Sequence, residues 1–351
     1  MSLFERVADL PISLDDQDTG INERETVAFT RKTTTVMLGG DGETGLGEDV
    51  TYEADEHDAL AQDGLPSLAG EYTLRSFSEH LADVDLFPAG APEREVFRNY
   101  RRWGVESAAL DLALRQAGTD LGAVVDRAYD PLRFVVSPKL GDPPTTERVE
   151  DVLALHDDLE FKLDAEPEWT GELLDDLAAL DRVRVVDMKG QYEGTEVDQG
   201  ANPDLLRRVL EALPDALVED PKLTDETRAI LDPVAERVSW DAPLHDVADV
   251  ADFPWSPRWL NCKPSRFGTV ESLFSFLDYC AANDVSLYGG GQFELDVGRG
   301  QIQLLASLCY PDGPNDVAPM GYNDPDLDAD LPGSPLSPKA ASVGFRWGED
   351  A

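Results

Sequence analysis

Short apolar runs alternate with amphipathic stretches through most of the second half of the chain. Seven runs have the length and the branched or aromatic composition of strands: residues 132–138, 159–163, 183–188, 216–218, 238–240, 259–262 and 285–288. Helical stretches lie between them, at residues 146–156, 170–180, 203–213, 225–231 and 270–282. Strands that alternate with helices form a parallel sheet. Seven such units favour a closed (β/α) barrel over an open doubly wound sheet.

The N-terminal third of the chain has a different pattern. Residues 33–38 begin with four β-branched residues and lead into the turn-forming Gly-Gly-Asp-Gly of residues 39–42. A second short strand follows the Gly-Leu-Gly-Glu of residues 45–48, and residues 101–117 carry one apolar helical face that ends at Gly118. This pattern predicts a small antiparallel sheet with a helix.

We therefore expect an α/β protein with one large domain and a smaller partner, since 351 residues are many for a single compact core. The predicted parts are an α+β domain over residues 1–130, a modified (β/α)8-type TIM barrel over residues 131–320, and a C-terminal segment over residues 321–351. The C-terminal segment is rich in Pro, Asp and Gly.

The net charge of the chain argues against some classes of binding partner. The chain has 71 acidic and 29 basic residues and a net charge of −42, so the phosphates of nucleic acids and of anionic membranes would be repelled. The acidity is spread along the chain and lysines are few, a habit suited to multimolar salt, where screening makes dense surface charge tolerable. Cys262, Cys280 and Cys309 show no paired or metal-type spacing, and no apolar run is long enough to cross a membrane. We expect a protein of the cytoplasm of a salt-accumulating microbe.

The ends of the predicted strands carry the candidate chemistry, because active sites on such barrels lie at the C-terminal ends of the strands. In chain order these ends hold Lys162, Asp187, Glu219, Asp241, Lys263 and Glu294. The three central carboxylates come from successive strands and would repel one another without a cation. Hard oxygen ligands suit Mg²⁺, or Mn²⁺. Lys162 and Lys263 flank these strands, where one could remove a proton and the other donate one or stabilise an anion.

Five motifs also follow one another in a recognisable order. They are GLGE at residues 45–48, VESAALDLA at 105–113, VEDP at 218–221, LNCKPSRFG at 260–268 and GGGQFE at 289–294. In this order they resemble the capping-domain turn, the hallmark helix, the strand-four metal motif, the strand-six lysine segment and the strand-seven turn of the enolase superfamily. The resemblance is to its mandelate racemase/muconate lactonizing enzyme family, in the branch of muconate-lactonizing enzymes, o-succinylbenzoate synthases and dipeptide epimerases.

The resemblance implies a Mg²⁺-dependent lyase or isomerase that removes the proton α to a substrate carboxylate through a metal-stabilised enediolate. Reactions of the racemase, epimerase, cycloisomerase and dehydratase types all fit it. It implies that Asp187, Glu219 and Asp241 are metal ligands and that Lys162 and Lys263 act as acid and base. It further implies that the N-terminal domain caps the barrel mouth, that the tail returns to this cap, that cap loops select a small-molecule carboxylate, and that the protein forms a homo-oligomer.

Three positions depart from the family pattern. The strand-two motif K-x-K reads Lys162-Leu163-Asp164 or, one register earlier, Glu160-Phe161-Lys162, so Lys162 matches either lysine of the motif. If it matches the first, Asp164 replaces the base. Lys189 stands at the Asn position of the strand-three motif D-x-N and is a candidate stand-in base, and Asp241 lacks its usual acidic neighbour.

A competing alignment makes Asp164 the strand-three ligand. Asp187 is preferred there, because it keeps one ligand on each strand and leaves Lys162 on strand two. Candidate substrate contacts are Glu294, His245, which follows Asp241 by four residues, and Tyr52 in a predicted cap loop. The other three histidines, at positions 57, 80 and 156, are expected on the surface.

Two other classes of function stay open. The departures from the family pattern also fit a repurposed or catalytically impaired metal-binding barrel. A sugar-processing barrel with two carboxylates as acid and nucleophile would need no metal and would stay active in EDTA.

Overall fold

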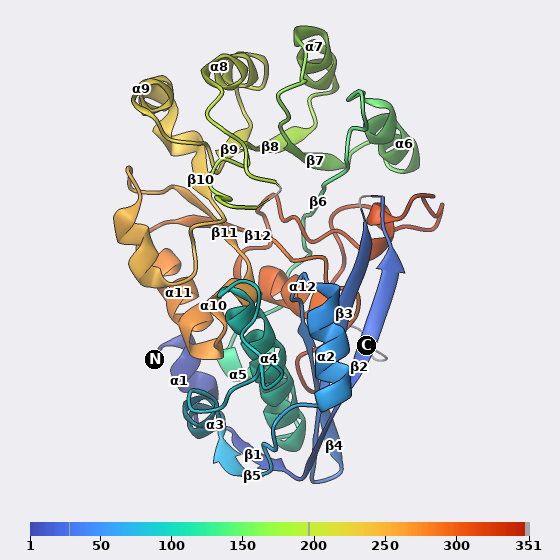
Figure 1. The fold of residues 1–351 in the computed structure, drawn as a ribbon, viewed down its shortest axis with the longest axis vertical. Helices are drawn as coiled ribbons and strands as arrows, with labels where there is room; N and C mark the ends of the chain where they lie inside the picture. Colours follow the sequence, from blue (N-terminus) through green and yellow to red (C-terminus); the bar gives the residue numbers. More distant parts are fainter. Residues whose placement is uncertain (28, 196, 348–351) are drawn as a thin grey trace.

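The computed structural model describes residues 1–27, 29–195 and 197–347 (Figure 1). Its N-terminal part contains helices α1 (Leu3–Val7), α2 (Ala54–Asp63), α3 (Leu74–Leu81), α4 (Phe97–Gln116) and α5 (Leu121–Val125). The strands of this part are β1 (Pro11–Leu14), β2 (Asp16–Glu25), β3 (Thr30–Gly40), β4 (Glu43–Asp49) and β5 (Gly70–Thr73). Strands β2, β3 and β4 form an antiparallel sheet, and β1 pairs with β5 in a second one.

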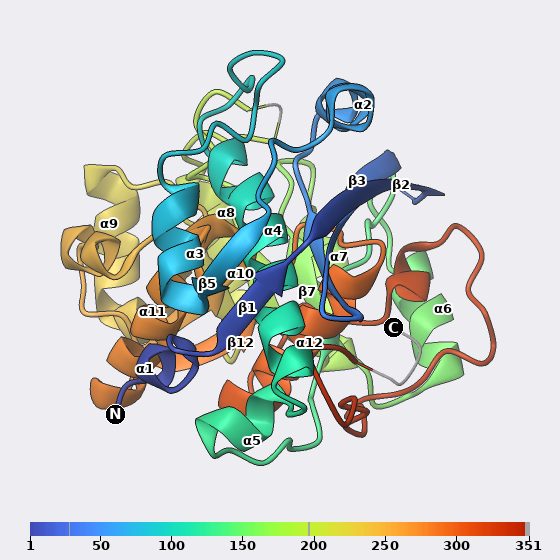
Figure 2. The same cartoon turned by 90° about the horizontal axis from the view of Figure 1, so that it is seen from below.

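Helix α4 lies directly on strands β3 and β4, and two glycines of β4 explain the close approach. A Cβ atom on Gly45 would lie 2.1 Å from the carbonyl oxygen of Ala108, and one on Gly47 would lie 2.1 Å from that of Gly104. The glycines of the predicted turn motif are therefore positions where helix and strand backbones touch. Figure 2 shows α4 in the middle of this N-terminal layer, with α3 beside it.

The second part is a parallel barrel. Its strands are β6 (Val135–Val136), β7 (Glu160–Asp164), β8 (Val183–Asp187), β9 (Leu217–Glu219), β10 (Val238–Trp240), β11 (Trp259–Cys262) and β12 (Ser286–Gly289). Its helices are α6 (Glu147–Leu155), α7 (Gly171–Leu180), α8 (Pro203–Ala212), α9 (Asp225–Leu231), α10 (Pro264–Phe267), α11 (Val270–Ala282) and α12 (Val297–Cys309), with 3-10 turns η1 (Asp232–Arg237), η2 (Val247–Asp252) and η3 (Met320–Asn323). Figure 1 shows α6 to α9 as an outer arc around the strands.

The seven parallel strands pair in chain order from β6 to β12. Among the described residues no eighth regular strand joins them, and an irregular segment closes the ring instead. The N–H of Val135 in β6 donates to the carbonyl of Asn315 at 2.8 Å, and the N–H of Asp316 donates to the carbonyl of Gly289 in β12 at 2.8 Å. Residues 315–316 thus take the eighth position of the barrel.

The expected α/β class, a modified TIM barrel with an α+β cap, is confirmed. Strands β9 and β10 are buried throughout, as parallel strands covered on both faces must be. The helices begin where the sequence supplies caps: the side chains of Thr170, Thr224 and Thr269 accept backbone N–H groups at the starts of α7, α9 and α11.

The C-terminal segment runs back to the N-terminal part. The N–H of Phe345 donates to Oδ1 of Asp111 in α4 at 2.6 Å, and Nε of Arg346 donates to Oδ2 of the same residue at 2.7 Å. Within the described ranges, no helix is both long and apolar enough to cross a membrane.

Candidate functional site

The strand ends of the barrel bring the predicted charged residues together. Asp187 ends β8, Glu219 ends β9 and Asp241 follows β10, and all three are fully buried. Lys162 lies in β7 and Lys263 follows β11, and their exposed fractions are 2% and 8%. The pairing order of the sheet places β8, β9 and β10 between β7 and β11. Three carboxylates thus lie between two lysines, as the chain order predicted.

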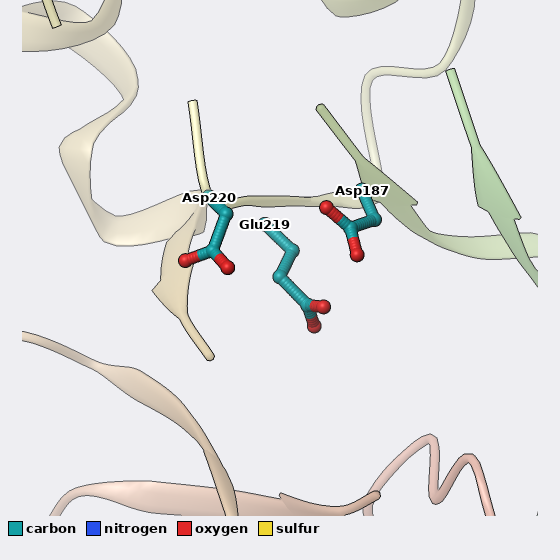
Figure 3. Close-up of side chains that lie close together, drawn as sticks. All are labelled: Asp187, Glu219 and Asp220. Carbon is teal, nitrogen blue, oxygen red and sulfur yellow. The ribbon is translucent and has the colours of Figure 1, made fainter. Parts of the chain in front are cut away.

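The carboxylates of Asp187, Glu219 and Asp220 form a close group. Each offers one oxygen, and these oxygens lie within 4.8 Å of one another (Figure 3). Burial and then the charges of neighbouring carboxylates raise the pKa of Glu219 to about 8, although Lys162 lowers it, and raise that of Asp220 to about 7. Carboxylates this close favour a shared proton or a cation. The group therefore suits a divalent ion with oxygen ligands.

Asp220 was missing from the predicted ligands. Its two oxygens accept the backbone N–H groups of Asp241 at 2.9 Å and of Ala242 at 2.8 Å, so it ties the end of β9 to the end of β10. Its φ of 47° puts it in the left-handed region. Its place in the strand-four motif, directly after Glu219, was the available signal.

Asp241 binds its neighbours with one oxygen only. Its Oδ2 accepts from the Tyr192 hydroxyl at 2.7 Å, from Nζ of Lys263 at 2.8 Å and from Arg266 at 3.3 Å. Burial raises the pKa of Asp241, but the charges of Arg266, Lys263 and Lys162 together outweigh it and hold this pKa below its usual range. Oδ1 is buried and has no hydrogen-bond partner. An ionised carboxylate with one unpartnered buried oxygen fits a cation ligand.

Lysines already neutralise the other carboxylates. Nζ of Lys162 donates to Oε1 of Glu219 and lies 3.8 Å from Asp187 and 3.8 Å from Asp316. Nζ of Lys189 lies 2.5 Å from Oδ2 of Asp187. Burial lowers the pKa of both lysines, but the surrounding acids raise it well above its usual value. Each predicted ligand therefore has a lysine of its own: Asp187 has Lys189, Glu219 has Lys162 and Asp241 has Lys263.

Lys189 also connects Asp187 to further charged residues. Lys189 has a φ of 52°, an unusual conformation for a long side chain, and it also lies 3.1 Å from Oδ1 of Asp164. Lys139 donates to the other oxygen of Asp164 at 2.7 Å. In the sheet register Asp164 is level with Asp187, whereas Glu160 is held by Arg133 and Arg184. Of the strand-two candidates, only Lys162 contacts Glu219.

The three predicted substrate contacts have partners of their own. The Tyr52 hydroxyl donates to Oε1 of Gln292 at 2.9 Å, which joins the cap to the turn after β12. Glu294 is buried in the same turn and lies 3.4 Å from Arg299. His245 is half-buried, and burial followed by the charge of Arg266 lowers its pKa.

Among the other histidines the expectation of a surface position is wrong for His57. It is fully buried, with Nδ1 2.8 Å from the Thr34 hydroxyl and Nε2 2.7 Å from the carbonyl of Thr51. Sequence reasoning also missed four residues that contact the predicted charged residues. Tyr192, Tyr288 and Asp316 lie on loops or inside the barrel and carry no pattern of their own, whereas Arg266 lies in α10, inside the strand-six motif at residues 260–268, which was the available signal.

Two family models match the chain. One, described as the C-terminal domain of a domain of unknown function (DUF8230), matches residues 128–324, and the N-terminal domain of the same description matches residues 5–124. No curated protein matches the sequence.

Solved structures are similar over most of the chain. A dipeptide epimerase from Methylococcus capsulatus complexed with Mg ion is 20% identical, with a TM-score of 0.66 over 96% of this chain and 99% of that one. Muconate lactonizing enzyme from Pseudomonas putida is 20% identical, with a TM-score of 0.61 over 84% and 83%. An enolase-superfamily member from Listeria innocua is 16% identical, with a TM-score of 0.64 over 90% and 88%. The fold is therefore that of the enolase superfamily.

Proposed function

The chain belongs to the family described as the domain of unknown function DUF8230, and we propose that it is a Mg²⁺-dependent lyase or isomerase. In this proposal the reaction removes the proton α to the carboxylate of a small-molecule substrate. The observation that carries it is the order of the barrel strands, with Asp187, Glu219 and Asp241 on three neighbouring strands between Lys162 and Lys263.

The donor set fits the metal. Asp187, Glu219 and the unpartnered Oδ1 of Asp241 would hold Mg²⁺, with Asp220 fixing the strand ends behind them. All ligand atoms are hard oxygens, as Mg²⁺ or Mn²⁺ requires. When bound, the ion would supply positive charge beside the substrate carboxylate and so make the α-proton more acidic.

The two lysines supply the proton transfers. Lys162 and Lys263 come from opposite sides of the carboxylates, so they would meet opposite faces of a carbon held between them. Lys162 now keeps its proton because Glu219, Asp187 and Asp316 raise its pKa. If Glu219 and Asp187 held a cation, the pKa of Lys162 would fall, so that Lys162 could release its proton to solvent and then accept the α-proton. Lys263 would then deliver a proton or stabilise the anion from the other side.

The substrate and the exact reaction are narrower proposals. A related fold, the dipeptide epimerase of Methylococcus capsulatus, has been solved with Mg and the dipeptide L-Arg-D-Lys, so dipeptides are the first substrates to try. Tyr52, His245 and Glu294 are proposed substrate contacts. We also propose the domain division at residues 130 and 320, homo-oligomer formation, and a salt-rich cytoplasm as the working environment.

The test is α-proton exchange in D₂O, followed by mass spectrometry over dipeptides, N-acylamino acids and acid sugars. Exchange should require Mg²⁺, stop in EDTA, and be abolished in Lys263→Ala. Lys222→Ala is the matched control, because Lys222 pairs with Glu193 at 2.5 Å outside the carboxylate group. Exchange that survives both EDTA and Lys263→Ala would contradict the proposal, and activity on sugars in EDTA would favour a glycosidase.

A second candidate function is a metal-binding barrel without turnover. The observation in its favour is that Lys189, Lys162 and Lys263 each already pair with one predicted ligand, in a chain that lacks parts of three family motifs. Calorimetry would then show Mg²⁺ binding while no compound of the panel exchanges its proton. Turnover of any of them removes this candidate.

A further inference from the structure

Tyr288 of β12 places its ring in an apolar cluster of the barrel interior and its hydroxyl beside buried polar groups. The residue is fully buried and packs with Val185 of β8 and Leu217 of β9 in a small core cluster, with Trp259 beside them. Phenylalanine would fill the same space. Burying the extra hydroxyl costs free energy unless it is hydrogen-bonded, so its partners indicate what the oxygen does there.

The hydroxyl lies between Glu219 and Ser239. It donates to Oε2 of Glu219, and it lies 2.8 Å from the Ser239 hydroxyl. A phenol hydroxyl has one hydrogen to donate. Because Tyr288 donates it to Glu219, Ser239 is the donor in the bond between the two hydroxyls. The order of donation is therefore Ser239 to Tyr288 to Glu219. All three groups are completely buried, so water does not compete for these bonds.

These bonds hold one oxygen of the Glu219 carboxylate. Its Oε2 accepts from Tyr288 and from Nδ2 of Asn261, the latter at 3.2 Å. Its other oxygen, Oε1, is the one that meets Lys162, whose Nζ is also near Asp187. Two donors on Oε2 fix the rotation of the carboxylate, and in this rotation Oε1 meets Lys162.

We propose that Tyr288 is a positioning residue for the metal ligand Glu219, and that Ser239 supports it. The inference rests on the proposed metal site. Tyr288 acts by holding one oxygen of Glu219 so that the other is presented for coordination, and outer partners of this kind typically contribute about 10- to 100-fold to metal affinity. No substrate contact is assigned to it.

The test measures Mg²⁺ binding by calorimetry on metal-free full-length protein, with Mn²⁺ electron paramagnetic resonance as a second readout. Tyr288→Phe should weaken binding by about 10- to 100-fold. Ser239→Ala should weaken it less, because Tyr288 still donates, and it provides a second test if Tyr288→Phe folds poorly. Tyr310→Phe is the matched control: it removes the hydroxyl of another buried tyrosine, one that lies beside Cys262 and Cys309.

The outcomes separate the two ideas. A purely structural role would lower the melting temperature of Tyr288→Phe and leave the Kd for Mg²⁺ within twofold of wild type, which would overturn the positioning role alone. A wild-type protein that binds neither Mg²⁺ nor Mn²⁺ would contradict the proposed function and the inference together. Binding that is weakened in Tyr288→Phe but unaccompanied by α-proton exchange would support the inference and leave only the proposed reaction refuted.

Discussion

The buried carboxylates on the two sides of the barrel mouth are neutralised in different ways. On the β10–β11 side, Lys263, Arg266 and Tyr192 all bind one oxygen of Asp241 and leave the other unpartnered. On the β7–β8 side, both oxygens of Asp187 are occupied by Lys189, through its backbone N–H at 2.9 Å and its Nζ at 2.5 Å. The first side is open to a cation, whereas the second already holds an ammonium group.

The difference follows the resemblance to the family motifs in part. The strand-six segment around Lys263 is intact and binds one oxygen of Asp241, whose other oxygen is free, although Asp241 lacks the acidic neighbour of its own motif. The strand-two and strand-three motifs are altered, and there the chain builds alternating charges from Lys139, Asp164, Lys189 and Asp187. Ammonium groups can thus stand in for part of the charge that a metal would supply. On the β7–β8 side metal binding would have to displace Lys189, and on the β10–β11 side it would displace nothing.

The largest expected effect concerns which lysine, Lys162 or Lys189, acts as the base. Lys162→Met should lower the rate of α-proton exchange by about 10²- to 10⁴-fold, the usual contribution of a general base, whereas Lys189→Met should lower it by less than about tenfold. Exchange rates in D₂O measured at saturating Mg²⁺ check this. A larger loss of exchange in Lys189→Met than in Lys162→Met would show that Lys189 is the base.

A smaller effect concerns the third ligand. Asp241→Asn should weaken Mg²⁺ binding by at least about 100-fold, beyond the range for an outer partner, because it removes the charged ligand with the free oxygen. Asp220→Asn should instead lower the free energy of unfolding by about 1–3 kcal/mol, since one of two buried N–H groups loses its acceptor. Calorimetry and urea unfolding separate the two. A larger loss of metal affinity in Asp220→Asn would move the third ligand to β9.

The smallest effect is the dependence of metal affinity on pH. The pKa of Glu219 is raised to about 8 and that of Asp220 to about 7, so both carboxyls hold protons at pH values where ordinary carboxyls are ionised. Protons therefore compete with the cation, and Mg²⁺ affinity should rise between pH 6 and pH 8 by up to about tenfold per unit for each proton released. Calorimetry in buffers of different ionisation enthalpy would count these protons. An affinity that is flat over this range would show that the carboxylates are already ionised.

Much of the fold was predictable because each element carries a local signal. The expected helices at residues 225–231 and 270–282 match α9 and α11 at both ends, and the strands at 238–240 and 259–262 match β10 and β11. Helix α12 was missed because it begins in a glycine-rich stretch, with Gly298 packed against Glu48 of the cap. The closing segment at residues 315–316 was missed because it is defined by tertiary hydrogen bonds to β6 and β12, which leave no pattern in the sequence.

The site was predictable to the level of strand ends. Because parallel strands align their C-terminal ends, Lys162, Asp187, Glu219, Asp241 and Lys263 had to approach one another once the barrel was recognised. Which of these side chains pair with one another could not be predicted from the sequence. The pairing of Lys189 with Asp187 depends on a left-handed backbone at Lys189, and the bond from Tyr288 to Glu219 crosses the barrel from β12 to β9.

The sequence by itself determined the barrel, its cap and the order of charged residues around the mouth, since hydrophobic periodicity and strand order act along the chain. Only the tertiary structure decided which oxygen of each carboxylate is engaged and which is free. Burial makes that decision, because a buried charge is costly unless a partner lies within a few ångströms, and the partners come from segments far apart in the sequence. Lys162 and Glu219 are 57 residues apart, and Tyr288 and Glu219 are 69 apart, yet their contacts define the site.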